Sequence, residues 1–133
     1  MKRCALFFLT LFFCVLLFSG CGKVMTENHQ RQLVDDTGQS VSLPSHPSRI
    51  VSLTYGTDEI LLGLVDTSRV AALSRYAGNP DISFVTKEEA EAVGRKVDMN
   101  AESIMALKPD LVIASTAVSP QLVSLLRQSG IPV

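Results

Sequence analysis

The stretch NAESIMALKPDLVIAS, from Asn100 to Ser115, places a helix signal directly before a strand signal. Asn100 is a favoured N-cap residue, and Pro109 ends the helix-forming segment that follows it. LVIAS (111–115) is a continuous apolar run of strand length, as in sheets that are covered on both faces. We therefore predict a helix from Ala101 to about Leu107, followed by a buried strand.

The same alternation extends in both directions from this stretch. Further strands are predicted at RIVSL (49–53), RVAALS (69–74) and, as the start of one, IPV (131–133). Further helices are predicted at DEILLGL (58–64), at TKEEAEAV (86–93) with a Thr86–Glu89 capping box, and at SPQLVSLLRQSG (119–130), between an N-cap Ser119 and Gly130. Apolar strands alternating with helices predict an α/β fold with a parallel sheet flanked by helices.

A small hairpin is predicted before the alternating region. LVDDTGQSVSLP (33–44) alternates apolar and polar residues around a turn signal at Asp36-Thr37-Gly38. Asp35 and Asp36 could together bind a cation, but adjacent carboxylates in a turn are usually solvated. We expect solvated side chains here.

The fold class itself predicts where a ligand would bind. In open parallel sheets, ligands lie beyond the carboxyl ends of the strands. The segments that follow three predicted strands are Tyr55-Gly56-Thr57, Arg75-Tyr76-Ala77 and Thr116-Ala117-Val118. These three segments form the predicted ligand-binding edge.

The N-terminus reads as an export signal. Lys2 and Arg3 precede an apolar run that is short for a membrane-spanning helix, although an uncleaved N-terminal anchor is the alternative. FSGC (18–21) resembles the lipobox of bacterial lipoproteins, with Phe18 where leucine is usual. The resemblance implies cleavage before Cys21 and lipid attachment to it. We divide the chain into a signal peptide (1–20), a flexible tether (21–32) and a folded part (33–133).

Composition and motifs exclude several functions. Without residues 1–20 the chain has 10 basic and 13 acidic residues, a balance that argues against nucleic acid as a partner. Removal of the signal leaves Cys21 as the single cysteine, so no internal disulfide and no cysteine metal site are expected. Phosphate-loop, nucleotide-binding, nucleophile-elbow and zinc-protease motifs are absent, and His29 and His46 lie far from the predicted edge. We do not expect an enzyme, a bound metal or a cofactor.

From Val34 onward the chain resembles a known family. DDTGQSVSLPSHPSRIVSL, TDEILLGL, NAESIMALKPDLVIAS and LRQSGIPV resemble, in order and spacing, the substrate-binding lipoproteins of bacterial ABC importers for iron-siderophores, haem and cobalamin. The resemblance implies two α/β lobes joined by one long helix, with the ligand held between them. It covers only the N-terminal lobe. We interpret the chain as a truncated form of a two-lobed periplasmic-binding fold, the alternative being a natural one-lobed protein.

The resemblance also implies functional residues. Tyr55 and Thr57 would contact ligand from the loop after the first strand, and Tyr76 from the loop after the second. Thr116 is a further candidate ligand contact, from its place at the predicted edge alone. Arg95 and Lys96 occupy a stretch (93–100), predicted as a loop, where siderophore binders present a basic residue. Glu102 matches the glutamate that docks this lobe onto the permease.

These residues predict an exported, lipid-anchored protein that captures ferric siderophores for an ABC permease. Basic side chains suit the oxygen-rich, often anionic surface of a ferric chelate. Cobalamin or haem is the alternative ligand within the family. Two other hypotheses stay open: a metal-chelatase-like enzyme on a similar fold, and a non-functional fragment.

Overall fold

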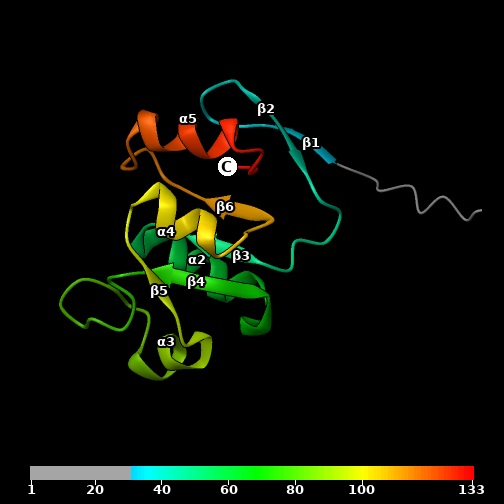
Figure 1. Ribbon diagram of the computed structural model, residues 1–133. Coiled ribbons are helices and arrows are strands. Elements are labelled where there is room, and N and C mark those ends of the chain that lie inside the picture. The colour runs from blue at the N-terminus through cyan, green and yellow to red at the C-terminus, as the bar shows by residue number, and fades with distance from the viewer. Residues whose placement is uncertain (1–30) are drawn as a thin grey trace, which may run out of the picture.

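The computed structural model describes residues 31–133, whose central element is a four-stranded parallel sheet (Figure 1). Its order is β5-β4-β3-β6, with β3 at Ile50–Ser52, β4 at Val70–Ser74, β5 at Lys96–Val97 and β6 at Leu111–Ile113. All three pairings are parallel. The predicted parallel α/β fold is confirmed.

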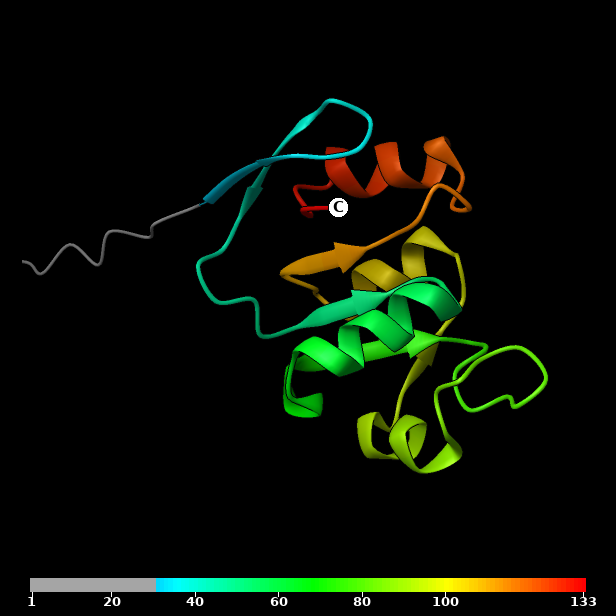
Figure 2. The ribbon, with the colours of Figure 1, turned by 180° about the vertical axis from the view of Figure 1, so that it is seen from behind.

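Helices cover both faces of this sheet. α2 (Tyr55–Leu64) and α3 (Lys87–Val93) lie on one face, and α4 (Ala101–Ala106) and α5 (Pro120–Gln128) lie on the other; η1 (Thr67–Arg69) is a single 3-10 turn before β4 (Figures 1 and 2). Neighbouring residues of β3 point to opposite faces. Val51 therefore packs in the core that contains Ile104 and Leu126, whereas Ile50 packs in the core that contains Leu61 and Ala90.

The helix starts follow local capping chemistry. Thr86 Oγ1 accepts from the Glu89 N–H at 3.1 Å, and Glu89 Oε2 accepts from the Thr86 N–H at 2.8 Å. The predicted capping box is therefore confirmed. Asn100 Oδ1 accepts from the Ser103 N–H at 3.1 Å, and Ser119 caps α5. Gly130 follows α5 with a φ of 79°, a conformation that glycine adopts without strain.

Several predicted elements differ from the structure. α2 begins at Tyr55, not Asp58, because Thr54 and Thr57 form a capping box one turn earlier than expected. Residues 96–97 form β5 where a loop was predicted, since a strand of two residues is too short to show a period in the sequence. Residues 131–133 form no strand, although Pro132 accepts one bond from the Val112 N–H at 2.9 Å. β6 also ends at Ile113, two residues before the predicted end at Ser115.

The predicted hairpin is confirmed, with β1 at Arg31–Val34 and β2 at Ser40–Leu43. β1 thus includes the last two residues of the predicted tether. The expectation of a solvated Asp35 is wrong. Its side chain accepts bonds from Thr37 and Gln39 and forms an ion pair with Arg127 of α5. The bonds from Thr37, followed by those from Arg127 and Gln39, hold the pKa of Asp35 well below its usual range.

The predicted signal peptide, the rest of the tether and the lipid-attachment residue Cys21 lie outside the described residues. Within residues 31–133, no helix is long and apolar enough to cross a membrane.

Candidate ligand-binding edge

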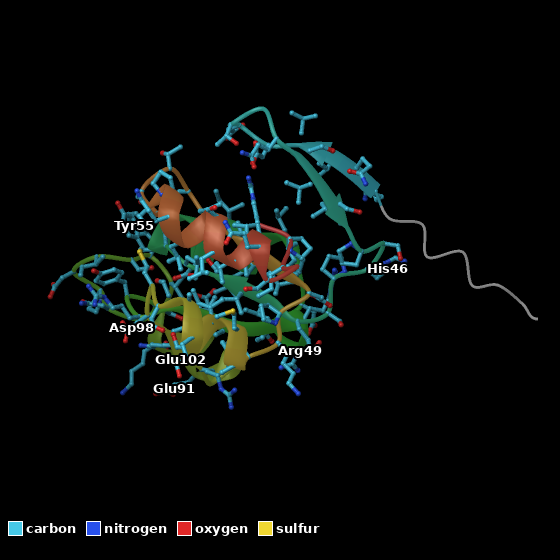
Figure 3. The ribbon with its side chains drawn as sticks, turned by 45° about the horizontal axis from the view of Figure 1, so that its top comes forward. His46, Arg49, Tyr55, Glu91, Asp98 and Glu102 are labelled. Carbon is cyan, nitrogen blue, oxygen red and sulfur yellow. The ribbon has the colours of Figure 1, made fainter. Side chains whose placement is uncertain are left out.

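The carboxyl ends of the parallel strands meet at one edge of the sheet, where a shallow hollow is present. It has a volume of about 230 Å³ and is lined by residues that follow or end β3, β4 and β5: Leu53, Arg75, Tyr76, Val97, Asp98, Met99 and Asn100. We call it the edge pocket. Figure 3 shows Asp98 and Tyr55 on the side of the molecule opposite His46. The pocket lies where the fold class predicts ligand binding.

The edge pocket combines an apolar base with a polar rim. Leu53 and Val97 are buried and continue the core between the sheet and the helices α4 and α5. Met99 is 45% exposed, and its flexible thioether can adapt to apolar parts of a ligand. Such a surface suits a ligand with both apolar groups and polar oxygens.

Arg75 is the cation at this rim, and Tyr76 and Asp98 hold it in place. Its Nη2 donates to the Tyr76 hydroxyl at 2.6 Å, and its guanidinium carbon lies 4.7 Å from the centre of the tyrosine ring. Its Nη1 is 3.5 Å from Asp98 Oδ1. The hydrogen bond to Tyr76 raises the pKa of Arg75. Like any arginine side chain, this guanidinium is charged at physiological pH. An exposed cation stacked on an aromatic ring can bind an anionic ligand.

The two predicted tyrosines differ in their place at this edge. Tyr76 lines the edge pocket, and its contact with a ligand stays a prediction. Tyr55 is the first residue of α2 and is 50% exposed; it does not line the pocket. Thr116 is exposed in the turn after β6 and is also outside the pocket lining.

Thr57 is directed into the protein. Its side chain is buried, and its hydroxyl lies 2.7 Å from the Ser52 hydroxyl and 2.9 Å from the Thr54 hydroxyl. These bonds anchor the first turn of α2 to the end of β3. They leave the Thr57 hydroxyl engaged within the protein.

The basic pair Arg95 and Lys96 lies elsewhere in the described structure. Lys96 is in β5, opposite Leu73 of β4, and not in the predicted loop. It lines a separate hollow of about 320 Å³ against α3, together with Gly78, Lys87, Ala90, Glu91 and Gly94. Neither Arg95 nor Lys96 lines the edge pocket, where Arg75 supplies the positive charge.

Arg75 belongs to the predicted ligand-binding edge but is not among the residues predicted to contact ligand. The signal was its place directly after an apolar strand and before Tyr76, a position that parallel topology brings to the ligand edge.

Glu102 is exposed in the first turn of α4, which Asn100 caps. A carboxylate there complements the positive end of the helix dipole. Within residues 31–133, no group of three or more histidine, cysteine or acidic side chains is arranged to hold a metal ion.

A family model described as periplasmic binding protein matches residues 50–133. This match covers most of the chain, so the chain belongs to the periplasmic binding protein family. The predicted family resemblance is confirmed.

Curated relatives are longer than this chain. It is 28% identical to the uncharacterized ABC transporter substrate-binding lipoprotein YvrC of Bacillus subtilis, over all of this chain and 45% of that protein. It is 30% identical to the probable siderophore-binding lipoprotein YfiY of B. subtilis, over 73% of this chain and 30% of YfiY. It is also 30% identical to a vitamin B12-binding protein of Yersinia pestis, over 70% of this chain and 32% of that protein.

Solved structures share the fold. The molybdate-binding protein MolA of Haemophilus influenzae superposes with a TM-score of 0.63 at 24% identity, over 77% of this chain and 33% of MolA. The heme-binding protein HmuT superposes with a TM-score of 0.57 at 27% identity, over 77% of this chain and 33% of HmuT. The aligned part is about a third of each neighbour, as expected for one lobe of a two-lobed protein.

Proposed function

We propose that this chain is the ligand-capturing N-terminal lobe of a substrate-binding lipoprotein of an ABC importer, and that its ligand is a ferric siderophore. The observation that supports the proposal is the edge pocket at the carboxyl ends of the strands. Arg75, stacked on Tyr76, lines this pocket together with the apolar residues Leu53 and Val97. The pocket is a binding surface without a nucleophile–histidine pair among its lining residues, which favours a transport role over an enzyme.

The ligand class follows from the chemistry of this surface. Ferric siderophore complexes present oxygen-rich and often anionic faces, and a guanidinium binds such oxygens through charge-assisted hydrogen bonds. The apolar base suits the carbon framework of a chelator. The similarity to a probable siderophore-binding lipoprotein supports the same ligand class.

Cobalamin and haem are the alternatives. Relatives and neighbours include a vitamin B12-binding protein and a heme-binding protein. Tyr76 and Met99 could pack against a flat macrocycle as well as against a chelator, so the pocket alone does not decide between the ligands.

Other predicted contacts complete the proposal. We propose that Tyr55 and Thr116 contact ligand from the same edge outside the pocket lining, and that Glu102 docks on the permease. Arg95 and Lys96 stay predicted contacts for parts of a ligand that extend beyond the pocket. Thr57 also stays a predicted ligand contact, although its hydroxyl already bonds to Ser52 and Thr54. Cys21 would carry the lipid that holds the exported protein at the membrane.

Calorimetric titration against a panel of ligands tests the proposal. The chain is titrated with an anionic ferric tris-catecholate, cyanocobalamin and haemin. One wall of a cleft supplies roughly half of the contacts while most of the cost of immobilising the ligand remains, so we expect binding near millimolar or weaker. An extended chain, in which a second lobe is joined to this one, should bind the ferric chelate tightly. Preference of the extended chain for cyanocobalamin or haemin would contradict the choice of ligand.

A further inference from the structure

Asp58, in the first turn of α2, is a fully buried carboxylate. Burial raises the pKa of its carboxyl group, although the serine hydrogen bonds oppose this effect. Among the ion pairs of residues 31–133, none includes Asp58. A buried charge without a cationic partner is costly, so its presence calls for a specific role.

Asp58 bonds to Ser74, the last residue of β4, and also to the side chain of Ser52 in β3. Asp58 Oδ1 accepts from the Ser74 N–H at 3.1 Å, and Oδ2 accepts from the Ser74 hydroxyl at 2.5 Å. The Ser74 oxygen in turn accepts from the Tyr76 N–H at 3.4 Å, and the Ser74 carbonyl accepts from the Ala77 N–H at 3.2 Å. The carboxylate therefore fixes Ser74, which directly precedes Arg75 and Tyr76.

The other end of this connection is the start of α2. The Asp58 N–H donates to the Thr54 carbonyl at 2.9 Å, within the turn that begins with Tyr55. Figure 2 shows α2 lying across the sheet next to β3 and β4. One carboxylate thus connects the two segments that carry Tyr55 and Arg75–Tyr76.

We propose that Asp58 is a positioning residue of the ligand-binding edge: through Ser74 it holds Arg75 and Tyr76 in the orientation that forms the edge pocket. The effect of Asp58 on ligand binding rests on the proposed function. The orientation itself is independent of any ligand.

Asp110 provides a matched control at the opposite, amino end of the sheet. Its carboxylate accepts from the Ser48 N–H at 2.7 Å, from the Ser48 hydroxyl at 3.0 Å and from the Arg49 N–H at 2.9 Å. It holds the start of β3 and lines neither hollow. Asp110→Ala should therefore disturb the fold without disturbing the edge pocket.

The first test measures order in the full chain without ligand. Amide ¹⁵N order parameters and hydrogen exchange are recorded for residues 74–77 in the wild type, Asp58→Ala, Ser74→Ala and Asp110→Ala. We expect lower order and at least tenfold faster exchange at the Tyr76 amide in the first two variants, with no such change in Asp110→Ala. Unchanged order at residues 75–77 in Ser74→Ala, or an equal change in Asp110→Ala, would overturn the proposal. Should Asp58→Ala not fold, Asp58→Ser, whose side chain is one bond shorter than that of aspartate, replaces it, because Ser74→Ala by itself also removes the acceptor of the Tyr76 N–H.

The second test measures binding of an anionic gallium(III) tris-catecholate by NMR titration. We expect at least threefold weaker binding by Ser74→Ala and near wild-type binding by Asp58→Asn, whose carboxamide can accept from the Ser74 N–H and donate to the Ser74 oxygen. Equally weakened binding by Asp110→Ala would show that any loss of stability weakens binding, and it would overturn the proposal. Absence of binding by the wild type would count against the proposed function only, because the first test decides the positioning role without ligand.

Discussion

Arg127, in the last turn of α5, donates a hydrogen bond to the carboxylate of Asp35, 92 residues earlier in the hairpin turn. The same guanidinium also bonds to the Gln39 side chain and, at 2.7 Å, to the Val133 carbonyl. Figure 1 shows the hairpin beside α5. One arginine thus fastens the hairpin to the sheet domain.

Arg127→Met should release the hairpin from α5 while leaving the sheet folded. Because the substitution removes the bonds of the guanidinium to Asp35 and Gln39, we expect faster hydrogen exchange in β1 and β2 and unchanged exchange in β3. Limited proteolysis in the hairpin provides a second readout. Unchanged protection of the hairpin would show that its docking depends on other contacts.

The Asp35 ion pair should also make docking of the hairpin pH-dependent. The pKa of Asp35 is lowered in the folded state, so its stabilising effect is complete above the unfolded pKa, near about 3.9. The effect is lost as the pH falls through the lower folded pKa. Asp35→Asn should remove this acid dependence from the hairpin amides, and a variant that kept the wild-type profile would contradict the assignment.

Two neighbouring leucines of α5 provide a test of the core. Leu126 is fully buried between α5 and the sheet, whereas Leu125 is 46% exposed. Leu126→Ala should lower the free energy of unfolding by about 2–5 kcal/mol. Leu125→Ala is the control and should cost roughly 1 kcal/mol or less. Urea denaturation measures both, and equal losses would contradict the packing of α5.

Burial of Asp58 predicts an unusual pH dependence of stability. Because its pKa is raised in the folded state, its contribution to stability is greatest below the unfolded pKa, near about 3.9, and declines as the pH rises through the folded pKa. Asp58→Asn removes this titration. The variant should therefore gain stability relative to the wild type as the pH is raised from 4 towards neutrality. A pH-independent difference in unfolding free energy between the two proteins would show that Asp58 does not titrate in this range.

Much of the fold was predictable from sequence because the signals were local. Strand hydrophobicity, the Thr86–Glu89 capping box and the pair Ser119–Pro120 each depend on neighbouring residues, and all three are confirmed. The missed elements depend on distant contacts. Residues 96–97 become a strand only because β4 lies beside them, and Asp35 is ordered by an arginine on α5.

The candidate site was predictable in place but not in detail. Parallel topology predicted the edge of the sheet at which the hollow lined by Tyr76 lies, and ligand binding there stays a prediction. It could not show that Lys96 lies in β5 and lines the hollow beside α3, because strand pairing decides this. Nor could it show that Thr57 turns inward to Ser52 and Thr54.

The lipid anchor is a prediction from the sequence FSGC. Cells that express the protein and are fed an alkyne analogue of palmitate should label it, and Cys21→Ser should remove the label. Ser19→Ala keeps a small residue before the cleavage site and serves as a control that should still be labelled. Label that persists in Cys21→Ser would contradict attachment at this residue.

The central claim is that the edge pocket, with Arg75 as its cation, binds ferric chelates. The most direct measurement is an NMR titration of the chain with an anionic gallium(III) tris-catecholate, comparing the wild type with Arg75→Gln and Lys96→Gln. We predict shift changes at Tyr76, Asp98 and Met99, binding that is at least threefold weaker in Arg75→Gln, and a smaller loss of binding in Lys96→Gln. Shift changes confined to the hollow beside α3, with binding lost in Lys96→Gln and retained in Arg75→Gln, would contradict the claim.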